Sequence, residues 1–223
     1  MSDLLNIFST AYPRLLEGLG ITLVLTVIPM VLGTLFGVGL ALGKIYGNRI
    51  LSGFITVFIE IIRGTPLLVQ LFILYFSLPP YGIRLSALTA ALIGFTINSG
   101  AYQAEYLRGS IQSVSSGQLK AALSIGMSRW QGIFYIILPQ ALRRVIPSWT
   151  NEFIYLLKYT SLAYIIGAQE LMGQARFVAS RNFEFFKVYL IAAVIYLLLV
   201  LVLTAVFNRL ERRYRIPGFD YKR

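Results

Sequence analysis

Residues 188–207 read VYLIAAVIYLLLVLVLTAVF, twenty consecutive residues without a charged side chain. About 20 mostly apolar residues are needed for a helix to cross the hydrocarbon core of a bilayer. Two further uncharged stretches run from Ile21 to Leu42 and from Leu85 to Tyr102. The sequence therefore predicts an integral membrane protein whose spans are helices, since a helix satisfies its own backbone hydrogen bonds in lipid.

Two more apolar segments are interrupted by polar residues. Residues 51–79 contain Glu60, Arg63 and the helix-breaking sequence Gly64-Thr65-Pro66, and residues 145–168 contain Glu152 and Lys158. We therefore predict one all-α membrane domain over residues 1–223, with five transmembrane helices at about 15–43, 51–79, 85–112, 131–158 with a continuation to 173, and 185–210. Two shorter helices are predicted in addition, an N-terminal interfacial helix at Ser2–Tyr12 and a cytoplasmic helix at about 117–127.

The composition excludes most soluble protein classes. Of the 223 residues, 57% are hydrophobic and 13% are charged, against about 25% charged in an ordinary globular chain. The net charge of +11 would suit a nucleic-acid-binding protein, but such a protein does not carry long apolar runs. Cysteine and histidine are both absent, which excludes a disulfide framework and the usual Cys or Ser/His nucleophiles. A membrane-embedded enzyme is therefore the least favoured class.

The positive charges indicate an orientation, because cytoplasmic loops are enriched in lysine and arginine. With the N-terminus outside and the C-terminus inside, five basic residues lie on the outer side: Arg14, Arg84, Arg176, Arg181 and Lys187. The inner side then holds thirteen of the twenty: Lys44, Arg49, Arg108, Lys120, Arg129, Arg143, Arg144, Arg209, Arg212, Arg213, Arg215, Lys222 and Arg223.

The polar stretch at residues 108–129 contains a short amphipathic helix. Ser115 or Ser116 can cap its N-terminus, the spacing of Leu119, Ala122 and Leu123 gives one apolar face, and Gly126 suits its C-terminal end. Such a helix is either a docking surface for a cytoplasmic partner or an interfacial helix without one.

Residues 120–128 (KAALSIGMS), followed by ILPQALR at 137–143, resemble the cytoplasmic EAA loop of ATP-binding-cassette importer permeases. Lys120 stands where that family usually has glutamate. Residues 63–70, 98–109 and 157–171 resemble the polar amino-acid branch of the family, so the resemblance covers nearly the whole chain. The residues that it implies for contact with an ATPase are Lys120, Ala121, Ala122, Gly126, Met127 and Ser128.

The resemblance implies a permease subunit of an ATP-driven type I importer in a bacterial cytoplasmic membrane. Its implied partners are cytoplasmic ATPase subunits that bind ATP and Mg, an extracytoplasmic amino-acid-binding protein, and a second permease copy or a sister permease. No phosphate-binding loop is present, since Ile45 follows the only Gly-Lys pair, so no cofactor is expected on this chain. An ion-coupled secondary transporter is the alternative, but it should show paired repeats, which five spans do not suggest.

Intramembrane polar residues are the candidate substrate site, because ionisable groups in a span are costly unless paired or hydrated. Glu60 with Arg63 and Glu105 with Arg108 have the i, i+3 spacing of local ion pairs. Glu152 has no base one turn away, so it either meets a base on another helix or faces a wet cavity. Our hypothesis is that it binds the ammonium or a cationic side chain of an amino acid. The remaining candidates either bind the ligand or hold helices together: Asn98, Ser99, Gln103, Thr160 and Ser161. Three acidic groups in or near spans favour a polar or basic amino acid as the substrate.

Two further features leave alternatives open. The break at residues 64–66 either frees backbone groups that line a cavity or is a packing kink. The spacings Gly33-x3-Gly37 and Gly39-x3-Gly43 permit close helix packing, either within the subunit or between subunits.

Overall fold

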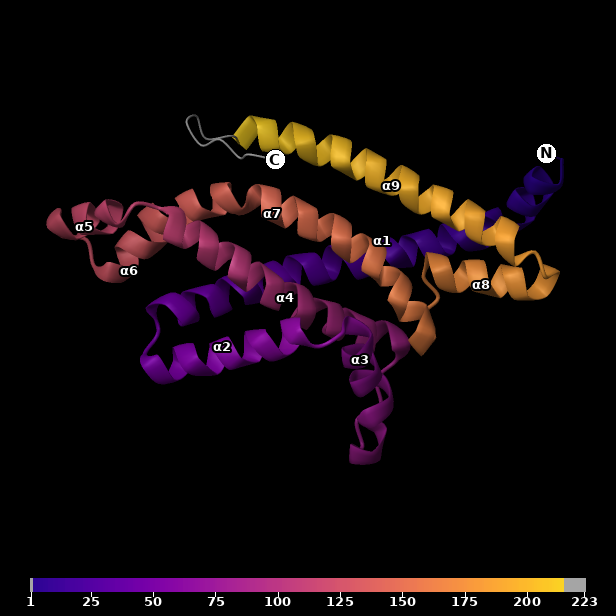
Figure 1. The fold of residues 1–223 in the computed structure, drawn as a ribbon, viewed down its shortest axis with the longest axis horizontal. Coiled ribbons are helices and arrows are strands. Elements are labelled where there is room, and N and C mark those ends of the chain that lie inside the picture. Colours follow the sequence, from indigo (N-terminus) through magenta and orange to yellow (C-terminus); the bar gives the residue numbers. More distant parts are fainter. Residues whose placement is uncertain (1, 215–223) are drawn as a thin grey trace.

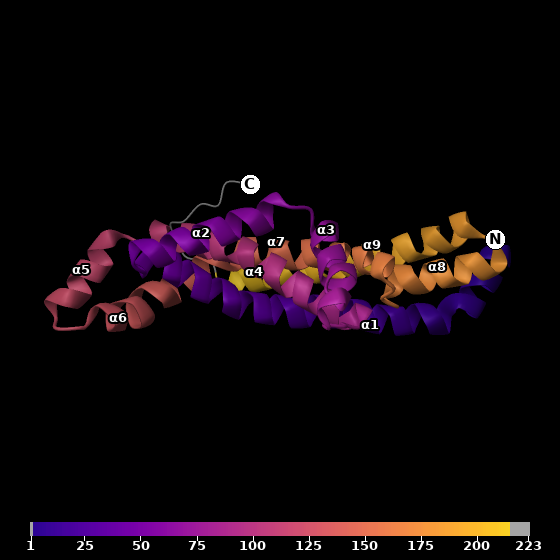
Figure 2. The same cartoon turned by 90° about the horizontal axis from the view of Figure 1, so that it is seen from below.

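The computed structural model describes the backbone of residues 2–214 and the side chains of residues 12–213. Within that range every element is helical, and the helices form a flat, elongated bundle (Figures 1 and 2). The α-helices are α1 (Ser2–Tyr46), α2 (Arg49–Gly64), α3 (Leu67–Phe72), α4 (Ala87–Ser113), α5 (Ser116–Ser124), α6 (Arg129–Gln131), α7 (Leu138–Tyr159), α8 (Leu171–Asn182) and α9 (Phe185–Tyr214). They are joined by π-helical turns η1 (Ile73–Ser77) and η3 (Gly132–Ile137) and 3-10 turns η2 (Pro79–Tyr81) and η4 (Thr160–Ile166).

Helix α1 corrects one expectation. It runs unbroken for 45 residues from Ser2, with Pro13 and Pro29 inside it, so Ser2–Tyr12 is not a separate interfacial helix. Proline is tolerated inside membrane helices because neighbouring groups satisfy the freed backbone, and no glycine or turn sequence separates the two segments. The amphipathic character expected for Ser2–Tyr12 concerns side chains that, up to residue 11, lie outside the described part of the chain.

Helices α1 and α4 approach each other through glycines. A Cβ on Gly33 would lie 3.2 Å from the backbone nitrogen of Gly100, and a Cβ on Gly37 would lie 2.9 Å from the Gly100 carbonyl oxygen. The first glycine spacing therefore serves packing inside this chain. Gly39 differs, since a Cβ there would meet no atom within 4 Å.

Helices α2 and α3 meet at a sharp bend, so residues 51–79 form two segments and not one straight span. The bend between Arg49–Gly64 and the segment Leu67–Tyr81 is 102°, and Pro66 stands directly before α3. The Gln70 side chain donates hydrogen bonds to the carbonyl oxygens of Ile62 (2.7 Å) and Thr65 (3.1 Å). It thereby satisfies carbonyl groups that the end of α2 leaves without helical partners.

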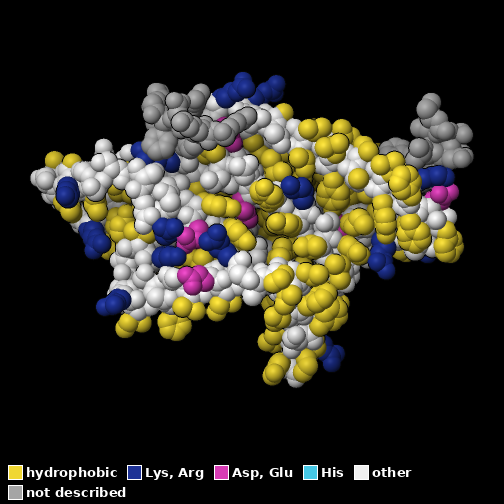
Figure 3. Space-filling view, viewed as in Figure 1, with side chains coloured by type: hydrophobic (Ala, Val, Ile, Leu, Met, Phe, Trp, Pro, Cys, Tyr) yellow, Lys and Arg dark blue, Asp and Glu magenta, His cyan; other side chains and the backbone are white. Residues whose placement is uncertain are grey.

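The helices differ in how apolar they are. Among the described helices, Tyr12–Tyr46 and Phe185–Arg213 are long and apolar enough to cross a membrane, and the bent pair α2–α3 is a third candidate. Hydrophobic side chains cover much of α9 and the projecting segment that begins with α3 (Figure 3). Helices α4 and α7 carry polar residues along their middle, and these residues form the candidate site.

The glycine contact gives a test of the fold. We expect Gly37→Ala to destabilise the protein by about 1–3 kcal/mol, because its methyl group would press on α4 backbone atoms that cannot move aside. Gly39→Ala is the matched control on the same helix, expected to be neutral or up to about 1 kcal/mol stabilising. Thermal unfolding of the purified protein in detergent measures both, and equal effects of the two variants would contradict the packing described.

Candidate functional site

A buried chain of hydrogen bonds joins α1, α4 and α7. The Trp149 indole N–H donates to the Thr34 hydroxyl at 2.8 Å, and that hydroxyl donates to Gln103 Oε1 at 2.6 Å. Gln103 Nε2 then donates to Ser99 Oγ at 2.9 Å. Ser99 and Gln103 are buried and their polar atoms are used between helices, which favours the structural alternative for these two residues.

Asn98 supports the bend between α2 and α3. It is buried, and its Nδ2 donates to Gln70 Oε1 at 3.1 Å. Because Gln70 binds the end of α2, Asn98 connects α4 to that end through a single side chain. The described contact of Asn98 is therefore structural.

Thr160 and Ser161 lie two turns beyond Glu152, roughly 12 Å further along at 1.5 Å per residue. Their hydroxyls donate to the carbonyl oxygens of Leu157 and Lys158, each at 2.7 Å. Ser161 also lines a cavity of about 350 Å³ whose other lining residues are Lys158, Met172, Tyr189, Ala192, Ala193 and Tyr196. The candidate residues thus do not form one cluster around Glu152.

Glu152 is buried on α7 with only 7% of its surface exposed. The Tyr106 hydroxyl of α4 donates to its Oε2 at 3.4 Å. No ion pair with a base on another helix is present in the described part of the chain. A carboxylate in this position keeps hydrogen-bonding capacity beyond the bond from Tyr106 that is seen among residues 12–213.

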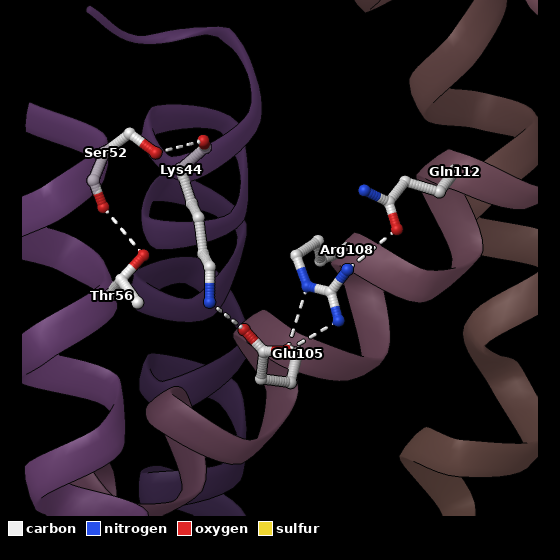
Figure 4. Close-up of polar contacts among 6 residues, drawn as sticks. All are labelled: Lys44, Ser52, Thr56, Glu105, Arg108 and Gln112. Carbon is white, nitrogen blue, oxygen red and sulfur yellow. Dashed lines mark hydrogen bonds and ion pairs between the residues drawn. The ribbon is translucent and has the colours of Figure 1, made fainter. Parts of the chain in front are cut away.

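Glu105 is the centre of an ion-pair network (Figure 4). Lys44 Nζ of α1 lies 2.7 Å from its Oε1, and Arg108 lies 2.9 Å from its Oε2. The i, i+3 pair is therefore confirmed for Glu105 and Arg108, while the contact with Lys44 was not foreseen, because nothing in the local sequence relates residues 61 positions apart. Figure 4 shows Ser52 of α2 bonded to Lys44 in turn, through the backbone oxygen of Lys44.

Arg63 and Glu60 do not repeat that pattern. Neither forms an ion pair within residues 12–213, and the Arg63 guanidinium lies 5.0 Å from the centre of the Tyr102 ring instead. Basic and acidic side chains gather where α2 faces α4 (Figure 3). Charges on such a face suit water or protein better than lipid.

Glu170 is a buried carboxylate that the sequence did not single out. It caps the N-terminus of α8 by accepting hydrogen bonds from the backbone N–H groups of Met172 (2.9 Å) and Gly173 (2.8 Å). The Tyr196 hydroxyl of α9 donates to it at 2.8 Å, and Leu171 N–H donates to Thr22 of α1. Glu170 therefore joins α8 to α9, and the N–H of the neighbouring Leu171 joins α8 to α1. Because glutamate is not among the preferred capping residues, nothing in the local sequence indicates that Glu170 caps α8.

The residues of the EAA-like segment lie at one end of the bundle (Figure 1). Ser115 caps α5, which ends at Ser124, short of the expected residue 127, because Gly126 has the left-handed φ of 85° that stops a helix. Ser128 and Gln131 form a capping box that starts α6. Lys120 and Ala121 are exposed, Ala122 is buried and Met127 is partly buried.

Exposed apolar side chains accompany this segment. Leu123, Ile125 and Trp130 are 47%, 79% and 54% exposed. Beneath them α5 packs on η3, since a Cβ on Gly132 would lie 2.8 Å from Leu119 Cδ1. An exposed apolar patch with a charged rim is typical of a protein-binding surface.

The chain is a bent, glycine-packed helical bundle with polar residues on its central helices and exposed apolar side chains at one end. Residues 33–216 match the family described as binding-protein-dependent transport system inner membrane component, and the chain belongs to this family. The resemblance seen in the sequence is thereby confirmed, and the expectation of a transport subunit in place of an enzyme is confirmed with it.

The sequences of individual relatives align with this chain over almost its full length. The chain is 41% identical over 208 residues to the glutamine transport system permease protein of Escherichia coli K12, covering 92% of this chain and 95% of the relative. It is 40% identical over 204 residues to a probable amino-acid ABC transporter permease protein of Bacillus subtilis, covering 92% and 90%. Its identity to the L-cystine transport system permease protein of Bacillus subtilis is 39% over 203 residues, covering 91% and 87%.

Solved structures share the fold. The crystal structure of an amino acid ABC transporter with histidines superposes with a TM-score of 0.86 at 37% identity, covering 92% of this chain and 96% of the other. An inward-facing structure of the MetNI methionine ABC transporter gives a TM-score of 0.77 at 20% identity, covering 91% and 97%, which is likeness of fold alone.

The ion-pair network provides the second prediction. We expect Glu105→Gln to destabilise the protein by about 1–3 kcal/mol, because the side chain is only 14% exposed and its loss leaves Lys44 and Arg108 unpaired. Glu184→Gln is the control, since the Lys187–Glu184 pair is more exposed and should contribute less than about 1 kcal/mol. Chemical unfolding in detergent compares the two, and a larger loss at Glu184 would refute the interpretation.

Proposed function

We propose that this chain is the membrane-spanning subunit of an ATP-driven importer of polar amino acids. The observation that carries the proposal is Glu152, a buried carboxylate in the polar centre of the bundle without an ion pair in the described residues. The names of the relatives, which include glutamine and cystine transport systems, support amino acids as the substrate class. An ion-coupled secondary transporter has no such support.

The choice between neutral and basic amino acids depends on the acidic groups. Glu105 is neutralised by two cations, so it no longer supports a basic substrate. Glu152 and the exposed Glu60 do support one. A basic substrate therefore remains a second candidate beside a neutral polar one.

We propose five spans in the bacterial cytoplasmic membrane, with the N-terminus outside and the C-terminus inside. The exposed apolar faces of α1 and α9 support contact with lipid, and the basic excess on the inner side supports the orientation. Arg215, Lys222 and Arg223, which contribute to that excess, lie outside the described residues.

A second permease, either another copy or a sister chain, completes the pathway in this proposal. The charged face between α2 and α4 supports it, because these side chains need water or protein opposite them (Figure 3). An extracytoplasmic binding protein would deliver the substrate.

The α5 end is the proposed contact with a cytoplasmic ATPase, which would bind ATP and Mg. Lys120, Ala121 and Ser128 offer exposed positions there, Ala122 and Met127 anchor the helix, and Gly126 ends it. Lys120 brings a positive charge, so an acidic group opposite it on the ATPase is expected.

The ATPase contact is tested by Leu123→Asp. This side chain is half exposed, so folding should be unaffected, while a carboxylate in an apolar contact should reduce co-purification of the ATPase and coupled ATP hydrolysis at least tenfold. Ser116→Ala, at an exposed position of the same helix, should change neither. Normal coupling in Leu123→Asp would exclude this surface.

Substrate recognition is tested by Glu152→Gln in proteoliposomes with the ATPase and binding protein. Uptake should fall at least tenfold, because hydrogen bonds to a charged group are about twice as strong as neutral ones. Glu184→Gln serves as the control, and a variant of the ATPase without its phosphate-binding lysine should abolish uptake. Unchanged uptake of lysine, arginine and neutral amino acids in Glu152→Gln would contradict the proposed role of Glu152. Uptake that survives without ATP hydrolysis would indicate a secondary transporter.

Glu60→Gln tests the choice between basic and neutral substrates. If this variant takes up less arginine and lysine but as much glutamine as the unaltered protein, the substrate is basic.

A further inference from the structure

Two arginines lie against one aromatic ring at the end of the bundle where α8 lies beside α9, opposite the α5 end (Figure 1). The Cζ atom of Arg14 on α1 is 4.3 Å from the centre of the Phe177 ring of α8, and the Cζ atom of Arg181 is 4.6 Å from the same centre. A guanidinium over a ring face is attracted to the ring. The ring therefore holds both cations in place, although both arginine side chains are exposed.

Neither arginine is neutralised by an acidic side chain within residues 12–213. Glu17 lies one turn beyond Arg14 on α1, yet no ion pair joins the two, and the ion pair found at this end joins Lys187 to Glu184 at 2.9 Å. The charges of Arg14 and Arg181 are thus available to an external anion. Guanidinium groups match phosphate oxygens with parallel N–H donors, which makes arginine the side chain best suited to phosphate recognition.

The turn between α8 and α9 presents apolar rings next to these charges. Phe183 and Phe186 are 82% and 80% exposed, and Phe183 has a φ of 59°, which is costly for a bulky residue. Across this turn Asn182 Oδ1 accepts the Glu184 N–H at 3.0 Å. Apolar side chains exposed beside charged ones are typical of a surface that contacts a membrane or a protein.

The length of α9 places this turn at the surface of a bilayer. The uncharged run of α9 begins at Val188, and its twenty residues extend for about 30 Å, the thickness of the hydrocarbon core. The headgroup layer adds about 5–7 Å on each side, and Phe186 and Phe183 lie two and five residues before Val188. The turn therefore lies at the depth of the lipid headgroups, which favours a lipid over a water-soluble protein as its ligand.

We propose that Arg14 and Arg181 bind the headgroup of an anionic phospholipid, with Phe177 as their platform and with Phe183 and Phe186 against its acyl chains. Basic residues at a bilayer surface attract anionic lipids, and apolar rings at the same depth add hydrophobic contact. In the proposed orientation this lipid belongs to the outer leaflet. The site goes beyond the transport function, because it rests only on the placement of α9 in the membrane.

Such a lipid would hold together two helices whose charges otherwise repel each other. Helix α8 is joined to α9 and α1 at its start, through Glu170 and the Leu171 N–H. At its far end α8 carries Arg181, and Arg14 of α1 lies against the same ring. One anionic headgroup there would offset the repulsion between the two guanidinium groups. Anionic lipid should therefore raise the thermal stability of the complex more than neutral lipid does.

The experiment titrates the complex of permease and ATPase in detergent with acyl-labelled phosphatidylglycerol, and with phosphatidylcholine labelled in the same way as the neutral probe. Fluorescence anisotropy measures binding. Arg14→Gln and Arg181→Gln should each weaken phosphatidylglycerol binding about fivefold, and the double variant about 10- to 30-fold, because each basic residue contributes separately to the attraction. Phosphatidylcholine binding should change less than about twofold in all three variants, since this lipid carries no net charge.

Arg84→Gln is the matched control, because it removes one exposed basic residue from the same proposed side of the membrane. It should leave both affinities unchanged. Phe177→Leu keeps an apolar side chain but removes the ring, so it should weaken phosphatidylglycerol binding while both arginines remain. Millimolar inorganic phosphate should not displace the labelled lipid, because phosphate lacks acyl chains.

Equal weakening by Arg84→Gln and by the two arginine variants at Phe177 would show a diffuse effect of charge and overturn the site. Displacement by inorganic phosphate would do the same, by reducing the site to one for small anions. If the double variant keeps its lipid affinity but loses affinity for the extracytoplasmic binding protein, the surface belongs to that protein and the inference is wrong. Should the double variant not assemble with the ATPase, the single variants decide the question. ATP-driven uptake is measured separately, and its absence in the unaltered complex would overturn the transport function without affecting the lipid site.

Discussion

The backbone contact between α1 and α4 is the constraint on which the rest of the bundle depends. Gly33 and Gly37 bring α1 against Gly100 so closely that a methyl group would meet backbone atoms. At this separation Thr34 reaches Gln103, and Trp149 of α7 donates to the same Thr34 hydroxyl. The glycines, which lack side chains, thus let the helices approach closely enough for their polar residues to meet. In a membrane this order of causes is expected, because lipid gives helices no hydrophobic reason to associate and packing must supply it.

The same geometry sorts the polar residues into two kinds. The polar side chains of the first kind are hydrogen-bonded within the bundle. Gln103 bonds Ser99 and Thr34, and Asn98 bonds Gln70. Glu152 and Arg63 have ring and hydroxyl contacts but no opposite charge in contact within the described residues. A charge that costs stability and has no structural partner is the feature expected of a binding group.

Much of the fold could be predicted from the sequence, and the predictions that failed did so for physical reasons. Apolar runs located α1 and α9, Gly126 indicated the end of α5, and the Gly64-Thr65-Pro66 sequence located the bend. The continuity of α1 through Pro13 was missed, because a proline reads as a boundary unless the surroundings satisfy the freed backbone. The partners Lys44 with Glu105 and Glu170 with Tyr196 could not be found from spacing, since they depend on how distant helices cross.

The close packing of α5 on η3 has a mechanical consequence. Gly132 leaves room for Leu119 and Ala122 to rest directly on the start of the helical run that becomes α7, and the capping box at Ser128 makes the intervening turn stiff. Because of this packing, a displacement of α5 would move the start of α7 with it. Arg144 of α7 also donates to Ser113 at the end of α4, which joins these two helices at the same end of the bundle. Since Glu152 lies on α7 and Tyr106, which is bonded to it, lies on α4, a displacement of α5 would change the surroundings of Glu152 through both helices.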